Sequence, residues 1–162
     1  MHLKTALMSY FRYKRQFCCG DEVRDCDVVV IDKEGWVYDI EVKISKADLW
    51  TGEAKKSKHK EYIEQIGRWT TPNYFYVCVP TVLLEEAKKW VKTVNPNYGI
   101  IEFTSENFTS KYHSNRYWEQ STYIRKKAKP LHNRVITRWQ EVLLRRLSSA
   151  MTTVYQSRME KK

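Results

Sequence analysis

The segment DVVVIDKEGWVYDIEVK, residues 27–43, determines the central part of the fold. Its first half, Asp27 to Asp32, is a β-branched apolar run typical of a buried strand. Lys33–Glu34–Gly35 predicts a three-residue turn, with glycine where the backbone needs a left-handed conformation. Trp36 to Ile44 then forms the returning strand. The segment therefore predicts a β-hairpin.

The turn also predicts which residues face one another. If Asp32 pairs with Trp36, the residue numbers of every pair sum to 68, and Asp27 lies opposite Glu41. Side chains alternate along a strand, so Lys43 shares a face with Glu41. Two carboxylates facing each other across a sheet are destabilising, and burial raises that cost. Asp39 and Asp25 have the same parity, but we expect them to be exposed charges at strand ends.

Two explanations account for this acidic hairpin. In the first, a divalent cation lies between the carboxylates, and oxygen ligands suit Mg²⁺ or Mn²⁺. Such a cation would position and acidify a water molecule beside a phosphate. In the second, Lys43 only neutralises the two carboxylates, and the three side chains form a buried salt-bridge triad. Such a triad stabilises the fold less than apolar residues in the same place would.

The remaining segments predict an α/β protein with a mixed sheet covered by helices. We expect helices over 2–16 and from Thr81 onward, and strands over 17–23, 74–79 and 98–103. After residue 105 the sequence becomes polar, aromatic and basic, and 131–159 has the pattern of an amphipathic helix. We therefore divide the chain into a core at 1–105 and an extension at 106–162 that packs on it.

Composition favours an anionic partner. The chain has 162 residues and a formal charge of +10, and proteins with such an excess bind polyanions because neutralised phosphates release counterions. The longest apolar runs are strand-sized, so no membrane partner is expected. The N-terminal residues lack the pattern of a signal peptide, which leads us to expect a cytoplasmic protein. The four cysteines have no zinc-site spacing.

Asp27, followed fourteen residues later by Glu41–Val42–Lys43, resembles the D…(D/E)xK signature of the PD-(D/E)XK nuclease superfamily. The order of helix, strand, acidic hairpin, helix and strand is also the order of that superfamily. More narrowly, RDCDVVVIDKEGWVYDIEVKISKADL (residues 24–49) resembles MmcB-type DNA repair proteins and related phage proteins. The resemblance runs from about Val23 to Phe103.

This resemblance implies a restriction-endonuclease-like core, with Asp27 and Glu41 as metal ligands and Lys43 as the catalytic lysine. We add Val42 as a further metal ligand. Many members contribute another acid from the first helix, but residues 2–16 contain no Asp or Glu, so Glu22 is our candidate. Gln65 is a candidate for binding the metal-bound water. Asp48 is expected to cap a helix.

Two groups of basic residues are candidates for DNA contacts. The first follows the hairpin directly and comprises Lys46, Lys55, Lys56, Lys58 and Lys60, with His59 among them. The second comprises Arg125, Lys126 and Lys127, near Tyr112, Tyr117, Trp118 and Tyr123, whose rings suit stacking on unpaired bases. The alternative is that each group is a solvated charged surface.

The expected function is a Mg²⁺- or Mn²⁺-dependent DNA nuclease, a structure-selective endonuclease or nickase. Two alternatives stay open: a non-catalytic DNA-binding repair accessory protein and an RNA-directed nuclease. Many nucleases of this kind cut both strands as dimers, so a homodimer is a further expectation, although no interface can be identified.

Overall fold

A computed structural model describes residues 2–64, 70–104 and 121–159, and its centre is the expected hairpin. Strands β2 (Cys26–Ile31) and β3 (Val37–Val42) pair antiparallel, from Val28 with Ile40 to Ile31 with Val37. Each pair sums to 68, so the predicted register is confirmed. Gly35 has φ +86°, and the Asp32 N–H donates to the Trp36 carbonyl at 3.1 Å. The turn thus has the predicted backbone.

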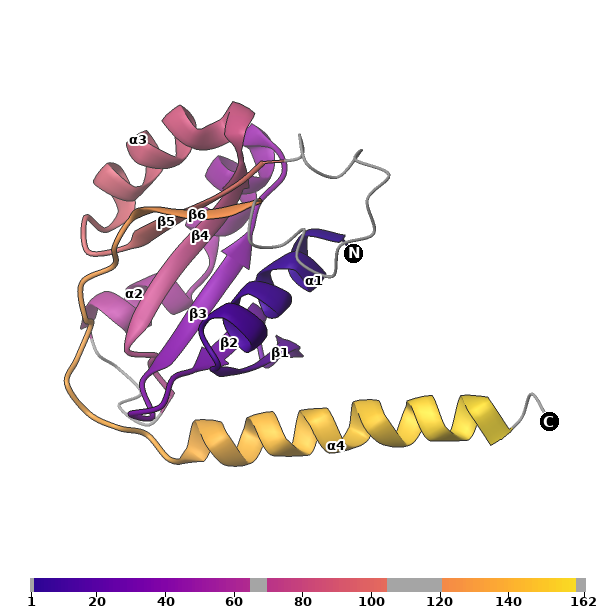
Figure 1. The fold of residues 1–162 in the computed structure, drawn as a ribbon. Helices are drawn as coiled ribbons and strands as arrows, with labels where there is room; N and C mark the ends of the chain where they lie inside the picture. The colour runs from indigo at the N-terminus through magenta and orange to yellow at the C-terminus, as the bar shows by residue number, and fades with distance from the viewer. Residues whose placement is uncertain (1, 65–69, 105–120, 160–162) are drawn as a thin grey trace.

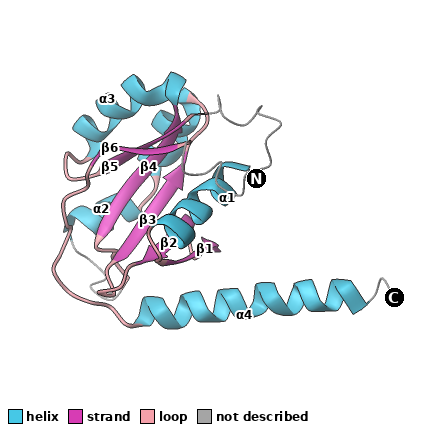
Figure 2. Cartoon of the chain, viewed as in Figure 1, coloured by secondary structure: helices cyan, strands magenta, loops and turns pink. Residues whose placement is uncertain are grey.

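The hairpin lies within a six-stranded mixed sheet of order β1-β2-β3-β4-β5-β6 (Figure 2). Strand β1 (Cys18–Val23) pairs antiparallel with β2, while β4 (Tyr74–Pro80) and β5 (Gly99–Phe103) continue parallel to β3. Strand β6 (Thr122–Lys126) closes the other edge antiparallel to β5. The predicted α/β class with a mixed sheet is confirmed.

Helix α1 (His2–Ser9), extended by a π-helical turn at Tyr10–Lys14, covers one face of the sheet. The apolar residues of this helix recur at helical spacing and therefore lie on one side of it. That side packs on β2 to β5. The core of this face consists of Ala6, Leu7, Tyr10, Phe11, Val28, Val30, Ile40, Tyr76, Cys78, Ile101 and Phe103.

The opposite face is covered by helices from three parts of the chain (Figure 1). Helix α3 (Leu84–Val94) buries Trp90 against β4 and β5, and α2 (Lys58–Glu64) buries Tyr62 in the same cluster. Helix α4 (Arg138–Met159) places Trp139 and Leu143 on β1 to β3. A π-helical turn (Asp48–Gly52) and 3₁₀ turns (Glu53–Lys55, Thr81–Leu83) complete these connections.

The division of the chain at residue 105 does not coincide with a structural boundary. Residues 122–126 form β6, a strand of the same sheet, so the second half is not merely an extension packed on a finished core. Helix α4 begins at Arg138, later than the expected position 131, and its first half does pack on the core as predicted. Among the described residues, no helix is long and apolar enough to cross a membrane.

Candidate active site at the end of the β2–β3 hairpin

The structure brings Asp27, Glu41 and Lys43 together. The Lys43 Nζ lies 2.9 Å from Glu41 Oε2 and 3.7 Å from Asp27 Oδ2. The same Asp27 oxygen accepts a hydrogen bond from the Val42 N–H at 2.9 Å. Lys43 is thus the link between the two carboxylates, on the same face as Glu41, as the alternation of the strand predicted.

A third carboxylate, Glu53, completes this group and was not predicted from the sequence. Glu53 is fully buried, and its Oε2 lies 2.9 Å from Lys43 Nζ and 2.8 Å from Lys56 Nζ. Since Lys56 Nζ is also 2.7 Å from Glu41 Oε2, two ammonium groups alternate with two carboxylates around a ring. In the sequence Glu53 stands in a polar, Lys-rich stretch, which contains no signal of burial.

His59 holds Glu53 from the other side. One ring nitrogen, Nε2, lies 2.9 Å from Glu53 Oε1, and the other, Nδ1, lies 2.9 Å from the Tyr98 hydroxyl. The sequence placed His59 in a charged surface run, but the side chain is buried among the aromatic rings of Tyr62, Phe75 and Trp90. His59 therefore anchors the ionic group to the apolar core.

Two expectations about exposure are wrong. Asp39, expected at the surface, is fully buried, and its Oδ2 accepts from Lys58 Nζ at 3.0 Å and from the Tyr62 hydroxyl at 2.9 Å. Lys58, expected to contact phosphates, is itself buried and also lies 2.5 Å from Glu41 Oε1. Lys58 turns inward because α2 packs on the face that carries Asp39 and Glu41, whose charges need a partner there.

The buried charges shift each other's protonation. Burial and the neighbouring Asp39 raise the pKa of Glu41 to about 7, although Lys58 opposes this. Burial lowers the pKa of Lys43, but Glu41 and Glu53 outweigh burial, and the pKa lies above its ordinary value. Burial likewise raises the pKa of Asp27, but hydrogen bonds from Lys4 and the Val42 N–H outweigh it, and the pKa is lowered. Lys43 is therefore held as an ammonium.

Glu22 reaches the site only through Lys4. The Lys4 ammonium contacts both Glu22 and Asp27, the latter at 2.8 Å. The first helix thus contributes a cation to the site. Asp48 is the first residue of the π-helical turn and not its cap, which is Ala47. The Asp48 N–H donates to the Ser45 hydroxyl oxygen at 3.1 Å, and the Asp48 carboxylate lies 3.9 Å from Lys43 Nζ. Gln65 lies outside the described residues.

The other candidate DNA contacts lie in different surroundings. Lys46, Lys55, Lys60 and Lys127 are exposed, and Lys46 Nζ is 3.3 Å from Glu86. Lys56 is half-buried in the ionic ring. On β6, Arg125 pairs with Glu102, and Lys126 donates to the carbonyls of Pro96 and Tyr98. The exposed lysines are thus available for phosphate contacts, whereas Lys126 and Lys56 are engaged within the fold.

The donor set has the right chemistry for a hard divalent cation, since Asp27 and Glu41 present carboxylate oxygens. Among the described residues, however, no group of three or more His, Cys, Asp and Glu side chains is gathered around one point. Glu41 is instead surrounded by the ammonium groups of Lys43, Lys56 and Lys58. A cation that binds Glu41 must therefore displace an ammonium, and Lys56 is the most exposed of the three, at 37% of its side chain.

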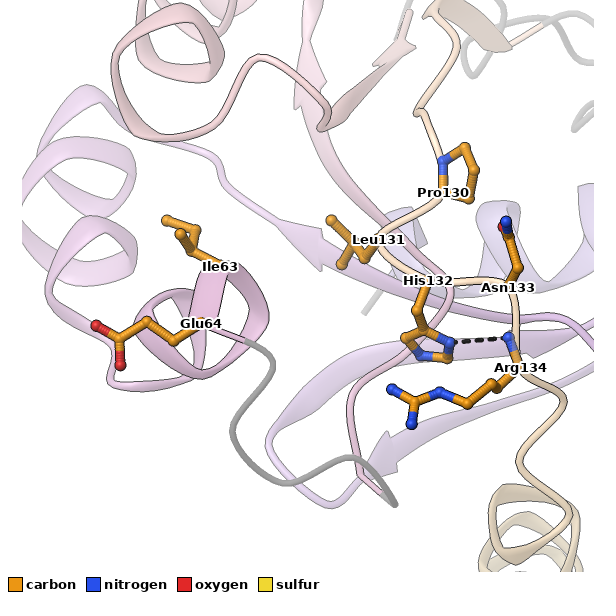
Figure 3. A pocket seen from close by; sticks show the side chains of 7 residues that line it. All are labelled: Ile63, Glu64, Pro130, Leu131, His132, Asn133 and Arg134. Atoms are coloured by element: carbon orange, nitrogen blue, oxygen red, sulfur yellow. Dashed lines mark hydrogen bonds between the residues drawn. The ribbon is translucent and has the colours of Figure 1, made fainter.

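A cavity of about 790 Å³ lies away from this group, between the end of α2 and residues 130–134 (Figure 3). Its histidine, His132, accepts the Arg134 N–H at 3.1 Å through Nδ1 (Figure 3). The other ring nitrogen, Nε2, lies 2.9 Å from the Thr71 carbonyl oxygen. Both ring nitrogens are therefore used to hold the chain in place. His132 has a structural role in this arrangement.

Comparisons with known proteins add a fold but no function. No family model and no curated protein matches the chain. The structure is similar to the SPO1766 protein of unknown function from Silicibacter pomeroyi, with a TM-score of 0.58 and 15% sequence identity. The match covers 97% of this chain and 89% of that chain, so both proteins share the fold over almost their whole length.

Proposed function

We propose that this protein is a metal-dependent DNA nuclease with a restriction-endonuclease-like core, a member of the PD-(D/E)XK superfamily. The observation that carries the proposal is the position of Lys43, whose ammonium lies 2.9 Å from Glu41 and 3.7 Å from Asp27. Two carboxylates and a lysine on adjacent strands are the groups that metal-assisted phosphodiester hydrolysis needs.

The order of elements supports the same proposal. Helix α1 precedes three antiparallel strands, and α2 then crosses to β4, which runs parallel to β3. This is the helix, strand, acidic hairpin, helix and strand order of the superfamily. Asp27 is the second residue of β2 and Glu41 the second-last residue of β3, so the candidate ligands meet at one end of this antiparallel pair.

The residues have distinct roles in this proposal. Asp27, Glu41 and the backbone oxygen of Val42 would hold Mg²⁺ or Mn²⁺, which supplies Lewis-acid activation of water and phosphate. Lys43 donates a hydrogen bond to the attacking water or to a phosphate oxygen as negative charge develops there. The water oxygen bonds to phosphorus and the water gives up a proton to solvent. One P–O ester bond breaks, and the leaving oxygen takes up a proton.

Glu53 positions Lys43 for this role. Lys43 is nearly fully buried and lies at equal distance from Glu41 and Glu53, so its ammonium is held between them. Asp27, Asp48 and Lys56 form the partly exposed rim through which a phosphate reaches it. Lys46, Lys55 and Lys60 follow on the surface, as expected of lysines that contact a DNA backbone.

One observation favours a second candidate function, a non-catalytic DNA-binding accessory protein. Three ammonium groups lie within 3 Å of the Glu41 carboxylate. A set of this kind neutralises the acidic hairpin without any bound cation, so it suits a protein that has kept the fold and binds DNA without cutting it.

The decisive experiment measures cleavage and binding in parallel. Supercoiled plasmid, single-stranded DNA, a branched junction and a matched RNA are incubated with Mg²⁺, Mn²⁺ or EDTA. Wild type is compared with Lys43→Ala and Glu41→Gln, and with Glu85→Gln as a control, because Glu85 is an exposed acid paired with Lys88. Thermal unfolding verifies that each variant is folded.

Metal-dependent cleavage that persists in Glu85→Gln and is lost in the two hairpin variants, with DNA binding retained, supports the nuclease. Binding by wild type without cleavage under any metal supports the accessory protein. Preferential cleavage of RNA would replace DNA as the substrate.

A further inference from the structure

Among the described residues, helix α4 contacts the core only over its first half. Leu143 packs so closely on β1 that a Cβ at Gly20 would lie 2.7 Å from Leu143 Cδ1. One turn later, Arg146 Nε donates to the Asp21 carbonyl at 3.2 Å. From Met151 to Met159 every residue is exposed, and Figure 1 shows this part of α4 extending beyond the rest of the molecule.

The free half has an apolar stripe. Leu144, Leu147, Met151 and Val154 recur at intervals of three, four and three residues, the a and d positions of a heptad. Leu144 is 64% exposed, Met151 56% and Tyr155 58%. Leu147, in contrast, lies partly against the core, so the stripe is continuous with the packed face of the helix.

The local sequence does not support this helix on its own. Thr152, Thr153 and Val154 are β-branched and favour helix less than straight-chain residues do. Most helical stability in proteins comes from packing of an apolar face, and the described residues offer none to this half. A helical segment with an apolar stripe at this place therefore requires a partner surface.

We propose that the partner is a second copy of the chain, bound through an antiparallel α4–α4 contact centred on Met151. The residues that flank the stripe, Ser148, Ala150 and Ser157, are small and uncharged, so two copies can approach closely. The arginines of the central part, Arg145 and Arg146, lie off the stripe.

Charge is complementary in this arrangement. When Met151 of one chain lies opposite Met151 of the second chain, Arg158 of the first lies level with Leu144 of the second. Glu141 of the second chain is three residues further along α4, about 4.5 Å along the helix axis. The Arg158 stem can pack on Leu144 while its guanidinium reaches Glu141, which also pairs with Arg145 of its own chain at 2.5 Å. A parallel arrangement would instead bring Arg158 beside Arg158.

The contact is small. The four stripe residues and Tyr155 would each lose roughly 60–100 Å² of exposed area. Together they would bury about 600–1,000 Å² over two copies, in the range of weak, transient interfaces. The charge of +10 on each chain also opposes association. We therefore expect a micromolar dimer. This inference does not depend on the proposed function.

Sedimentation equilibrium of the full chain at several concentrations and two salt concentrations tests the proposal. Wild type is expected to shift from 19.5 kDa to twice that mass as its concentration rises. Met151→Lys should stay monomeric, whereas Val82→Lys, a matched change at a side chain that is 86% exposed on another element, should dimerise like wild type.

A charge exchange tests the antiparallel arrangement. Arg158→Glu should weaken the dimer at least tenfold, and adding Glu141→Arg to it should restore most of the affinity. Wild type that remains monomeric at all concentrations would overturn the proposal, as would equal dimerisation of Met151→Lys. A dimer that the second charge change fails to restore would overturn the antiparallel geometry.

Discussion

Replacing Glu53 with glutamine should destabilise the protein strongly, because it leaves a buried positive charge without its partner. The side chain keeps its shape and loses its charge. The buried ionic group consists of Asp39, Glu41, Glu53, Lys43, Lys56 and Lys58. In wild type three carboxylates face three ammonium groups, and in the variant two carboxylates face three ammonium groups.

The structure sets the size of the effect. Removing one partner of a buried ion pair costs about 3–5 kcal/mol, since the remaining charge stays desolvated. Lys56 can turn toward solvent, because 37% of its side chain is already exposed, whereas Lys43 cannot. We therefore expect the loss to lie near the lower end, about 3 kcal/mol.

Urea unfolding followed by tryptophan fluorescence measures this loss, with an unchanged m-value indicating that the same surface is exposed on unfolding. Adding Lys56→Gln restores two charges of each sign and should recover about 1–2 kcal/mol. Glu85→Gln, which breaks an exposed pair with Lys88, should change stability by less than about 1 kcal/mol. A loss below about 1 kcal/mol for Glu53→Gln would refute the reasoning, because it would mean that the network is not buried and charged.

Three further predictions follow from single sites. Because the pKa of Glu41 is raised to about 7, a divalent cation that binds Glu41 must displace a proton at lower pH. The affinity for Mn²⁺, measured by calorimetry, should therefore rise between pH 6 and 8. Glu41→Gln should remove this rise. Gly35→Ala should lower the free energy of unfolding by about 1–2 kcal/mol. Gly35 has φ +86°, and an added Cβ would lie 3.0 Å from Val135. The loss should appear as a lowered Tm, and an unchanged Tm would argue against the turn described. Trp139→Ala should cost about 3–5 kcal/mol in urea unfolding, because Trp139 is buried and Arg24 lies 4.9 Å above its ring; a cost under 1 kcal/mol would mean that α4 contributes little to the core.

The hairpin could be predicted in detail because its determinants are local. Gly35 fixes the turn, the turn fixes the register, and alternation along β3 places Glu41 and Lys43 on one face. The strand at 74–79 was predictable because it is a short continuous apolar run ended by Pro80. The helix after Thr81 was predictable because its apolar residues recur with helical spacing.

The environment of the site was not predictable, because it depends on which segments pack over the sheet. Lys56 and Lys58 stand in a charged run that has no periodicity, and only the packing of α2 against β3 turns them toward Glu41. Asp39 was predicted at the surface because nothing in the local sequence reveals that Tyr62 and Lys58 cover it.

By itself the sequence determined the acidic hairpin, the pairing register and the shared face of Glu41 and Lys43, all of which follow from turn chemistry and strand geometry. Only the tertiary structure decided that Glu53 joins them, that residues 122–126 form a sixth strand, and that the second half of α4 is exposed within the described part of the chain. Each of these depends on contacts between residues distant in the chain. Burial and long-range pairing are set by the whole fold, whereas turns and periodicity are set by neighbouring residues.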